Sequence, residues 1–251
     1  MENRKGSGIF LGIVSVATLI VAIIGATFAY FSASTESEDG AVNVEAYEFK
    51  LSMNVDRIYP AASVAAAKQQ LIPMNPTGTV NGYTTGNNGT NLLYAINEAE
   101  EKCIDGHGLQ VCALYQVTIY NEAQNTVVMS GKLQTVSNVA DDKEGRTPFT
   151  NLEYQGLTGN HSDGTLATSG AATPINTEDG IIAISDITVS GATTGEDGEV
   201  VPGTGTAYVL VYLKEAGDQS AEMGATFTGK LVYTSKDDAA NQLSAMFSVG
   251  A

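Results

Sequence analysis

Residues 206–216 read TAYVLVYLKEA, and the fold can be predicted most directly from this stretch. Apolar side chains alternate between its two faces: Tyr208, Leu210 and Tyr212 share one face, and Val209, Val211 and Leu213 share the other. A strand that is apolar on both faces is covered on both sides in the folded protein. The stretch therefore predicts a fully buried β-strand.

Similar apolar runs with a period of two flank this strand along the chain, and turn signals separate them. The predicted strands lie within 42–55, 112–136 (with a turn around 121–125), 181–191, 225–235 and 241–251. The alternation slips by one near Tyr47, which indicates a bulge or a bend. Asp197-Gly198 predicts the turn of a hairpin tip within 192–205.

One helix is predicted after the leader, over residues 91–102, because Leu92, Ile96, Ala99 and Cys103 recur at helical spacing. Segments rich in Gly, Asn and Thr predict loop insertions near 75–91 and over 141–180. Seven or eight strands with one short helix predict a mainly β fold, an antiparallel β-sandwich or jelly roll spanning residues 42–251.

The composition limits the range of functions. The chain has 251 residues and a formal net charge of −16, with 12 Lys and Arg against 28 Asp and Glu. Such an acidic chain repels phosphate backbones, so no nucleic-acid partner is expected. A high net charge of one sign favours solubility, which suits an exported protein.

The N-terminus carries an uncharged apolar run, residues 8–31, behind a short segment that contains Arg4 and Lys5. The run is long enough for a membrane anchor helix. Small residues near its end also suit a signal peptide that is cut after Ala29 or Tyr30. In both cases the rest of the chain is exported, since the two basic residues hold the N-terminus inside. Residues 1–29 are therefore a signal peptide or anchor helix, and 30–41 a flexible acidic arm.

The stretch GATFAYFSASTES at 25–37 resembles the leaders of the TasA/camelysin family, which a SipW-type signal peptidase cuts. The match rests on Thr27, Phe28, Ala29, Tyr30 and Phe31, with Ser32 following them. GATFTGKLVYTS at 224–235 adds a looser similarity. The resemblance implies an exported β-sandwich protein, located outside the cell or on its surface. Several members polymerise into biofilm-matrix or surface fibres.

Cys103 and Cys112, the only cysteines, lie in CIDGHGLQVC. An even number in an exported chain predicts a disulfide, with a loop at 106–109 closing a small hairpin. A redox-active pair, or a metal site joined by His107, is the alternative reading. Two thiols and one imidazole, however, make an incomplete zinc site.

No catalytic motif is present, and we expect no enzyme activity and no cofactor. His161-Ser162-Asp163 places three triad residue types side by side, but a triad is assembled from separate segments. Acidic clusters could bind calcium, but none has the spacing of a calcium loop, and a solvated acidic surface is the simpler interpretation. These clusters are Glu36/Glu38/Asp39, Asp141/Asp142, Glu196/Asp197/Glu199 and Asp237/Asp238.

The sequence thus predicts a structural subunit that self-associates into extracellular fibres or a surface layer, with the freed arm from about Tyr30 to Val44 completing the next subunit. One alternative is an uncleaved, membrane-tethered display or adhesion module that touches the membrane only through its N-terminal segment. A protease of the camelysin type is a third hypothesis, for which metal ligands are lacking.

Overall fold

The computed structural model describes residues 44–46, 50–61, 70–78, 90–175 and 180–250. The chain divides into two units, Met1–Gly40 and Ala41–Ala251, and every described residue belongs to the second. The predicted leader, its cleavage region at 27–31 and the acidic arm lie outside the described residues. The second unit is mainly β, with antiparallel sheets and one short α-helix.

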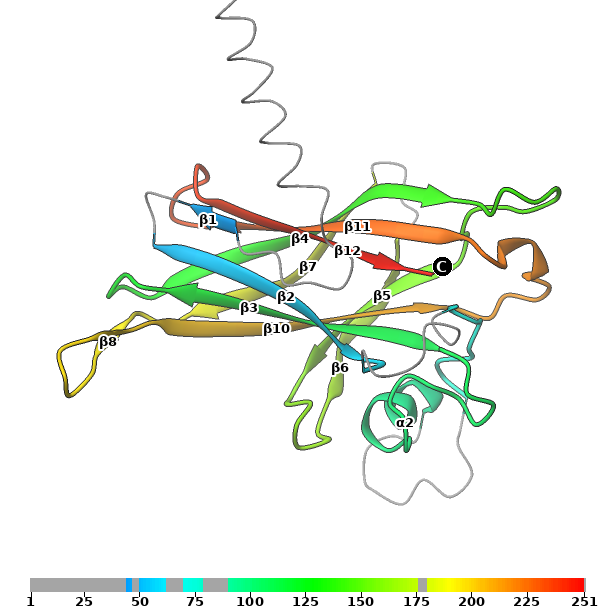
Figure 1. The fold of residues 1–251 in the computed structure, drawn as a ribbon, viewed down its shortest axis with the longest axis horizontal. Coiled ribbons are helices and arrows are strands. Elements are labelled where there is room, and N and C mark those ends of the chain that lie inside the picture. Colours follow the sequence, from blue (N-terminus) through cyan, green and yellow to red (C-terminus); the bar gives the residue numbers. More distant parts are fainter. Residues whose placement is uncertain (1–43, 47–49, 62–69, 79–89, 176–179, 251) are drawn as a thin grey trace, which may run out of the picture. The chain divides into compact units, whose positions relative to one another are not determined.

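The larger sheet has six strands in the order β1-β2-β3-β10-β5-β6. They are β1 (Val44–Ala46), β2 (Leu51–Tyr59), β3 (Cys112–Asn121), β10 (Gly203–Leu213), β5 (Leu152–Thr158) and β6 (Ala167–Pro174). The strand predicted from TAYVLVYLKEA is β10, which pairs with β3 on one side and with β5 on the other (Figure 1). Both of its faces are apolar because one lies in the core shared with the smaller sheet and the other in a cluster with α2, described below.

The smaller sheet has four strands in the order β12-β11-β4-β7. They are β4 (Val127–Val139), β7 (Ile181–Val189), β11 (Thr226–Ser235) and β12 (Gln242–Val249). A hairpin of β8 (Thr193–Thr194) and β9 (Val200–Val201) projects from the end of the molecule opposite the helix (Figure 1). Gly198 turns this hairpin with φ +81°, which confirms the predicted tip at Asp197-Gly198.

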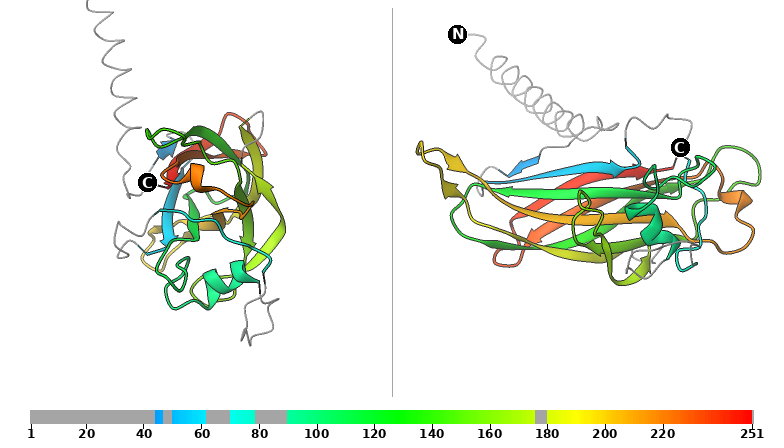
Figure 2. Two further views of the ribbon diagram at one scale, coloured as in Figure 1. Left: turned by 90° about the vertical axis from the view of Figure 1, so that its right-hand side faces the viewer. Right: turned by 90° about the horizontal axis from the view of Figure 1, so that it is seen from below.

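The two sheets face each other across one apolar core (Figure 2). Val209 and Val211 of β10 supply its centre from the larger sheet, and Phe227, Leu231 and Tyr233 of β11 supply it from the smaller one. All five side chains are almost completely buried. Alternating inward side chains on both sheets are the usual basis of such two-layer packing.

Two glycines bring the sheets together at one corner, where the end of β7 passes over the start of β10. A Cβ atom at Gly203 would lie 2.1 Å from the carbonyl oxygen of Ser190, and one at Gly205 would lie 2.6 Å from that of Thr188. The amide of Ser190 donates to the carbonyl of Thr204 at 3.3 Å. The two glycines of the Gly-Thr-Gly sequence at 203–205 therefore allow the two backbones to cross at close distance.

The outer face of the six-stranded sheet carries a second apolar cluster beneath α2 (Asn91–Asn97). Leu92, Leu93 and Ile96 of the helix pack there on Tyr208 and Leu210 of β10. The prediction that these tyrosine and leucine positions face away from the valine positions is thereby confirmed. Thr90 caps the helix, accepting a hydrogen bond from the amide of Leu93 at 3.3 Å.

The prediction that this helix extends to residue 102 is wrong, because it ends at Asn97. The Lys102 ammonium turns back and donates to the carbonyls of Asn97 at 2.9 Å and Ala99 at 2.7 Å, satisfying groups exposed at the helix end. Cys103 then adopts φ +60°, outside the helical region. The apolar spacing of Ala99 and Cys103 thus reflects their burial in the turn after the helix.

Two further predictions need correction. Residues 141–180 are not a loop insertion, because they contain β5, which pairs with the central strand, and β6 at the sheet edge. Residues 42–55 contain two antiparallel strands, since Val44 of β1 pairs with Met53 of β2. The first strand ends at Ala46 and the second begins at Leu51, and Tyr47 itself lies outside the described residues. Of the insertion predicted near 75–91, residues 79–89 lie outside the described part of the chain.

Candidate functional site

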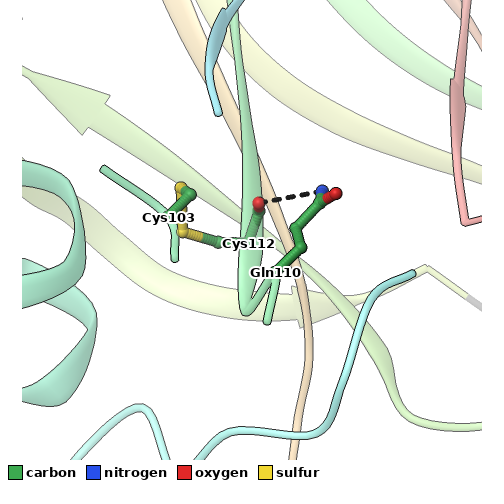
Figure 3. The surroundings of a disulfide bond; sticks show 3 residues. All are labelled: Cys103, Gln110 and Cys112. Atoms are coloured by element: carbon green, nitrogen blue, oxygen red, sulfur yellow. Dashed lines mark hydrogen bonds between the residues drawn. A yellow bond between two sulfur atoms is a disulfide. The ribbon is translucent and has the colours of Figure 1, made fainter. Parts of the chain in front are cut away.

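The predicted disulfide is present and joins Cys103 to Cys112 (Figure 3). Asp105 shapes the loop between them, since its Oδ1 atom accepts hydrogen bonds from the amides of His107 at 2.9 Å and Leu109 at 2.8 Å. Gln110 is buried and donates from its side-chain amide to the carbonyl of Cys112 at 3.0 Å. The bridge ties the segment after α2 to the first residue of β3, as a structural staple would.

The two histidines lie in different surroundings. His107 is exposed, 3.5 Å from Asp105. The Nδ1 atom of His161 lies 3.1 Å from the hydroxyl of Tyr208, whereas Ser162 donates to Asp163 at 3.0 Å. Within the described ranges, no group of three His, Cys, Asp or Glu side chains could hold a metal ion.

A pocket of about 740 Å³ opens on the outer face of the six-stranded sheet, beside α2. Glu153 and Gln155 of β5, Tyr212 of β10 and Lys214 after it form its polar floor. Leu92 and Leu93 of α2, Pro76 and Ala172 add apolar wall, and Thr77, Thr90 and Thr168 bring hydroxyl groups. The pocket therefore combines several polar groups with a smaller apolar surface.

Glu153 is the centre of this floor. The Tyr212 hydroxyl donates to its Oε2 atom at 2.6 Å, and the Lys214 ammonium donates to its Oε1 atom at 3.0 Å. Burial, together with the neighbouring carboxylate, raises the pKa of Tyr212 well above its ordinary value. The phenol therefore keeps its proton and remains a hydrogen-bond donor to Glu153 at physiological pH.

Gln155, two residues further along β5, is held just as firmly. Its side-chain nitrogen lies within hydrogen-bonding distance of the carbonyls of Gly156, Ser169 and Gly170, at 2.9, 3.2 and 3.3 Å. These contacts fix the amide plane beside the Glu153 carboxylate. Both side chains are nearly buried, at 8% and 4% exposure, although each is polar.

Reasoning from sequence missed this site because it assigned β5 to a loop. The signal was present in LEYQGLT, where Leu152 and Tyr154 alternate with Glu153 and Gln155. Because the two outward positions are polar, the segment looks like a short solvent-exposed stretch. Gly156, which is unfavourable inside a strand, weakens the alternation further. The cleavage residues Thr27, Phe28, Ala29, Tyr30 and Phe31 lie outside the described residues, so their role stays a prediction.

The edges of the six-stranded sheet form a second feature. At one edge of the six-stranded sheet, β1 pairs with only three residues of β2, Leu51–Met53. At the other edge, β6 contains no charged residue, and Thr168, Ser169, Gly170 and Ala171 are exposed. In the part of the chain that the structure describes, β6 pairs with β5 alone.

No helix among the described residues is long and apolar enough to cross a membrane. No protein-family model matches the chain, and no curated protein is significantly similar to it.

Proposed function

We propose that this chain is an exported structural subunit of the TasA type, an antiparallel β-sandwich that assembles into extracellular fibres or a surface layer. Its apolar leader is cut by a SipW-type signal peptidase within residues 27–31, and the freed arm pairs with a neighbouring subunit. The support for cleavage is the sequence GATFAYFSAS at 25–34.

The observation that carries the proposal is the edge strand β6. Natural monomers usually protect an edge strand with charged side chains, proline or a covering element. Residues 167–169 of β6 form a regular, uncharged stretch next to Gly156–Thr158 of β5, with Thr168 and Ser169 exposed and Ala167 partly buried. Beyond it, the strand bulges at Gly170, which has φ +73°, and ends at Pro174, so that end of the edge is protected. A strand donated by another subunit would extend the sheet at 167–169.

The opposite edge suits the same assembly. β1 begins at Val44, shortly after the predicted acidic arm, and extends over three residues against the nine of β2. In the sequence, the predicted arm therefore precedes an edge strand of the sheet closely. We expect the freed arm to pair with the edge strand of a neighbouring subunit.

Blocking β6 tests the proposal. We expect Ser169→Lys to reduce fibre formation strongly, because a charge at the edge opposes strand addition. The matched control is Thr206→Lys, which is also exposed but lies on the central strand β10, opposite Thr118 of β3. Equal fibre formation by both variants, measured by sedimentation and electron microscopy, would contradict the assignment of this edge.

The alternative is an uncleaved display or binding module held in the membrane by residues 8–31, and the pocket beside α2 favours it. Intact mass and N-terminal sequencing of protein from the native cell surface separate the two hypotheses. A start at Tyr30 or Phe31 supports the fibre subunit, whereas a start at Met1 or Glu2 supports the anchored module.

A further inference from the structure

We propose that the pocket between α2 and the strands β5, β6 and β10 binds a neutral saccharide unit. This binding site is independent of fibre assembly, since its lining residues differ from the regular edge stretch of β6 except at Thr168. Its volume of about 740 Å³ lies in the range of pockets that hold small molecules.

The polar floor is unusual because its side chains are buried. On the outer face of this sheet, positions away from α2 such as Thr204 and Thr206 are polar but exposed, whereas the buried positions near α2 and its following turn are otherwise mainly apolar, among them Leu114, Leu157 and Leu210. Glu153 and Gln155 are nearly buried, and burying polar or charged side chains seldom stabilises a fold more than apolar residues of the same volume do. Glu153, Gln155 and Lys214 therefore suggest a role in ligand binding.

The floor is also preorganised. Glu153 is held from two sides, by Tyr212 at 2.6 Å and Lys214 at 3.0 Å, and the amide nitrogen of Gln155 is fixed on backbone carbonyls. A ligand that meets such groups loses little free energy in ordering them. Lys214 has half of its side chain exposed and two further N–H groups with which it can donate.

The chemistry of the lining favours a neutral polyol over an ion. The charged groups in the pocket are one ammonium, that of Lys214, and two carboxylates, those of Glu153 and Glu215, so their formal charges sum to −1. An anionic ligand would face two carboxylates, and a cationic one would compete with Lys214 for Glu153. Sugar hydroxyls both donate and accept, so they match a lysine, carboxylates, amides and threonine hydroxyls placed close together.

The apolar part of the lining fits the same ligand. Pro76, Leu92, Leu93 and Ala172 supply apolar surface to the lining. A pyranose ring presents C–H groups on its faces and hydroxyls at its rim, so it can cover such a surface while its rim reaches Glu153 and Lys214.

Saturation-transfer NMR and isothermal titration on the folded chain test the inference. The probes are glucose, galactose and N-acetylglucosamine, with glucuronate as the anionic and glucosamine as the cationic counterpart. We expect at least one neutral sugar to bind. Glu153→Gln and Lys214→Met should each weaken that binding roughly 10- to 100-fold, the usual effect of removing a charged hydrogen bond.

The matched control is Lys236→Met, which breaks a surface ion pair with Asp186 on the other sheet, where the lysine side chain is equally exposed (51% against 50% for Lys214). It should leave sugar binding unchanged, and melting curves should show that all three variants are folded. The proposal is overturned if no neutral sugar binds with a Kd below about 10 mM. It is equally overturned if only a charged probe binds, or if both pocket variants bind the sugar as the parent protein does.

Discussion

The two faces of the six-stranded sheet carry different kinds of side chain. The inner face packs apolar side chains against the four-stranded sheet, and Leu231 and Val209 illustrate its uniform character. The outer face changes along its length, from the apolar cluster under α2 to the polar floor around Glu153. The inner face thus stabilises the fold mainly by burying apolar side chains. The outer face buries fewer apolar side chains and holds polar groups in a pocket.

Truncation in the inner core is the most severe test of this difference. Leu231→Ala removes a side chain with 1% or less of its surface exposed and leaves a cavity between two rigid sheets. We expect the free energy of unfolding to fall by about 3 kcal/mol, within the usual range of 2–5 kcal/mol. Chemical denaturation measures it, and a loss below about 1 kcal/mol would contradict a tightly packed inner core.

Removal of the disulfide tests the outer face near α2. Replacing both Cys103 and Cys112 with alanine opens a small loop, which costs about 2.5–3 kcal/mol in the loop-entropy description. We expect the loss of hydrogen-exchange protection to concentrate in α2 and the loop that follows it. Uniform loss over both sheets would show that the outer cluster is not a separate layer of stability.

The same substitution at two tyrosines compares the faces directly. Tyr212→Phe on the outer face removes a hydrogen bond to the Glu153 carboxylate, and we expect a loss of about 1.5–3 kcal/mol. Tyr233→Phe on the inner face removes a buried hydroxyl that has no hydrogen-bond partner among the described residues. That change should leave stability unchanged or raise it by up to about 1 kcal/mol.

The Tyr233→Phe variant should also change how the free energy of unfolding depends on pH. Burial raises the pKa of Tyr233 above its ordinary value of 10.0, so the folded chain keeps this proton where the unfolded chain loses it, and the free energy of unfolding falls as pH rises above 10. Tyr233→Phe should therefore flatten the alkaline side of the stability profile. If both variants destabilise the protein equally, the hydroxyl of Tyr233 has a partner, and the contrast between the faces is weaker than described.

The smallest effect is expected at the surface of the other sheet. The Lys236 ammonium, 2.6 Å from Asp186, holds the pKa of that carboxyl below its ordinary value. Its contribution is therefore present above the unfolded pKa of about 3.9 and is lost as pH falls below it. Because the pair is about half exposed, Asp186→Asn should change stability by less than about 1 kcal/mol. A larger change at neutral pH would contradict this estimate.

The contrast between the apolar inner face and the partly polar outer face also explains which elements can be predicted from the sequence. Val209, Val211 and Leu213 alternate with Tyr208, Leu210 and Tyr212, so the central strand and the orientation of its faces could be predicted. The disulfide could also be predicted, since only one pairing exists. The strand β5 is harder to predict, because its alternation is short and its outward residues Glu153 and Gln155 are polar yet buried, and only the hydrogen bonds seen in the structure explain that burial.

The central claim is that the arm links exported subunits into fibres. The most direct test is sedimentation velocity and electron microscopy of two proteins, one spanning residues 30–251 and one spanning 42–251, at equal concentrations. The account predicts fibres from the first and monomers from the second. Fibres from both, or monomers from both across concentration and salt, would contradict it.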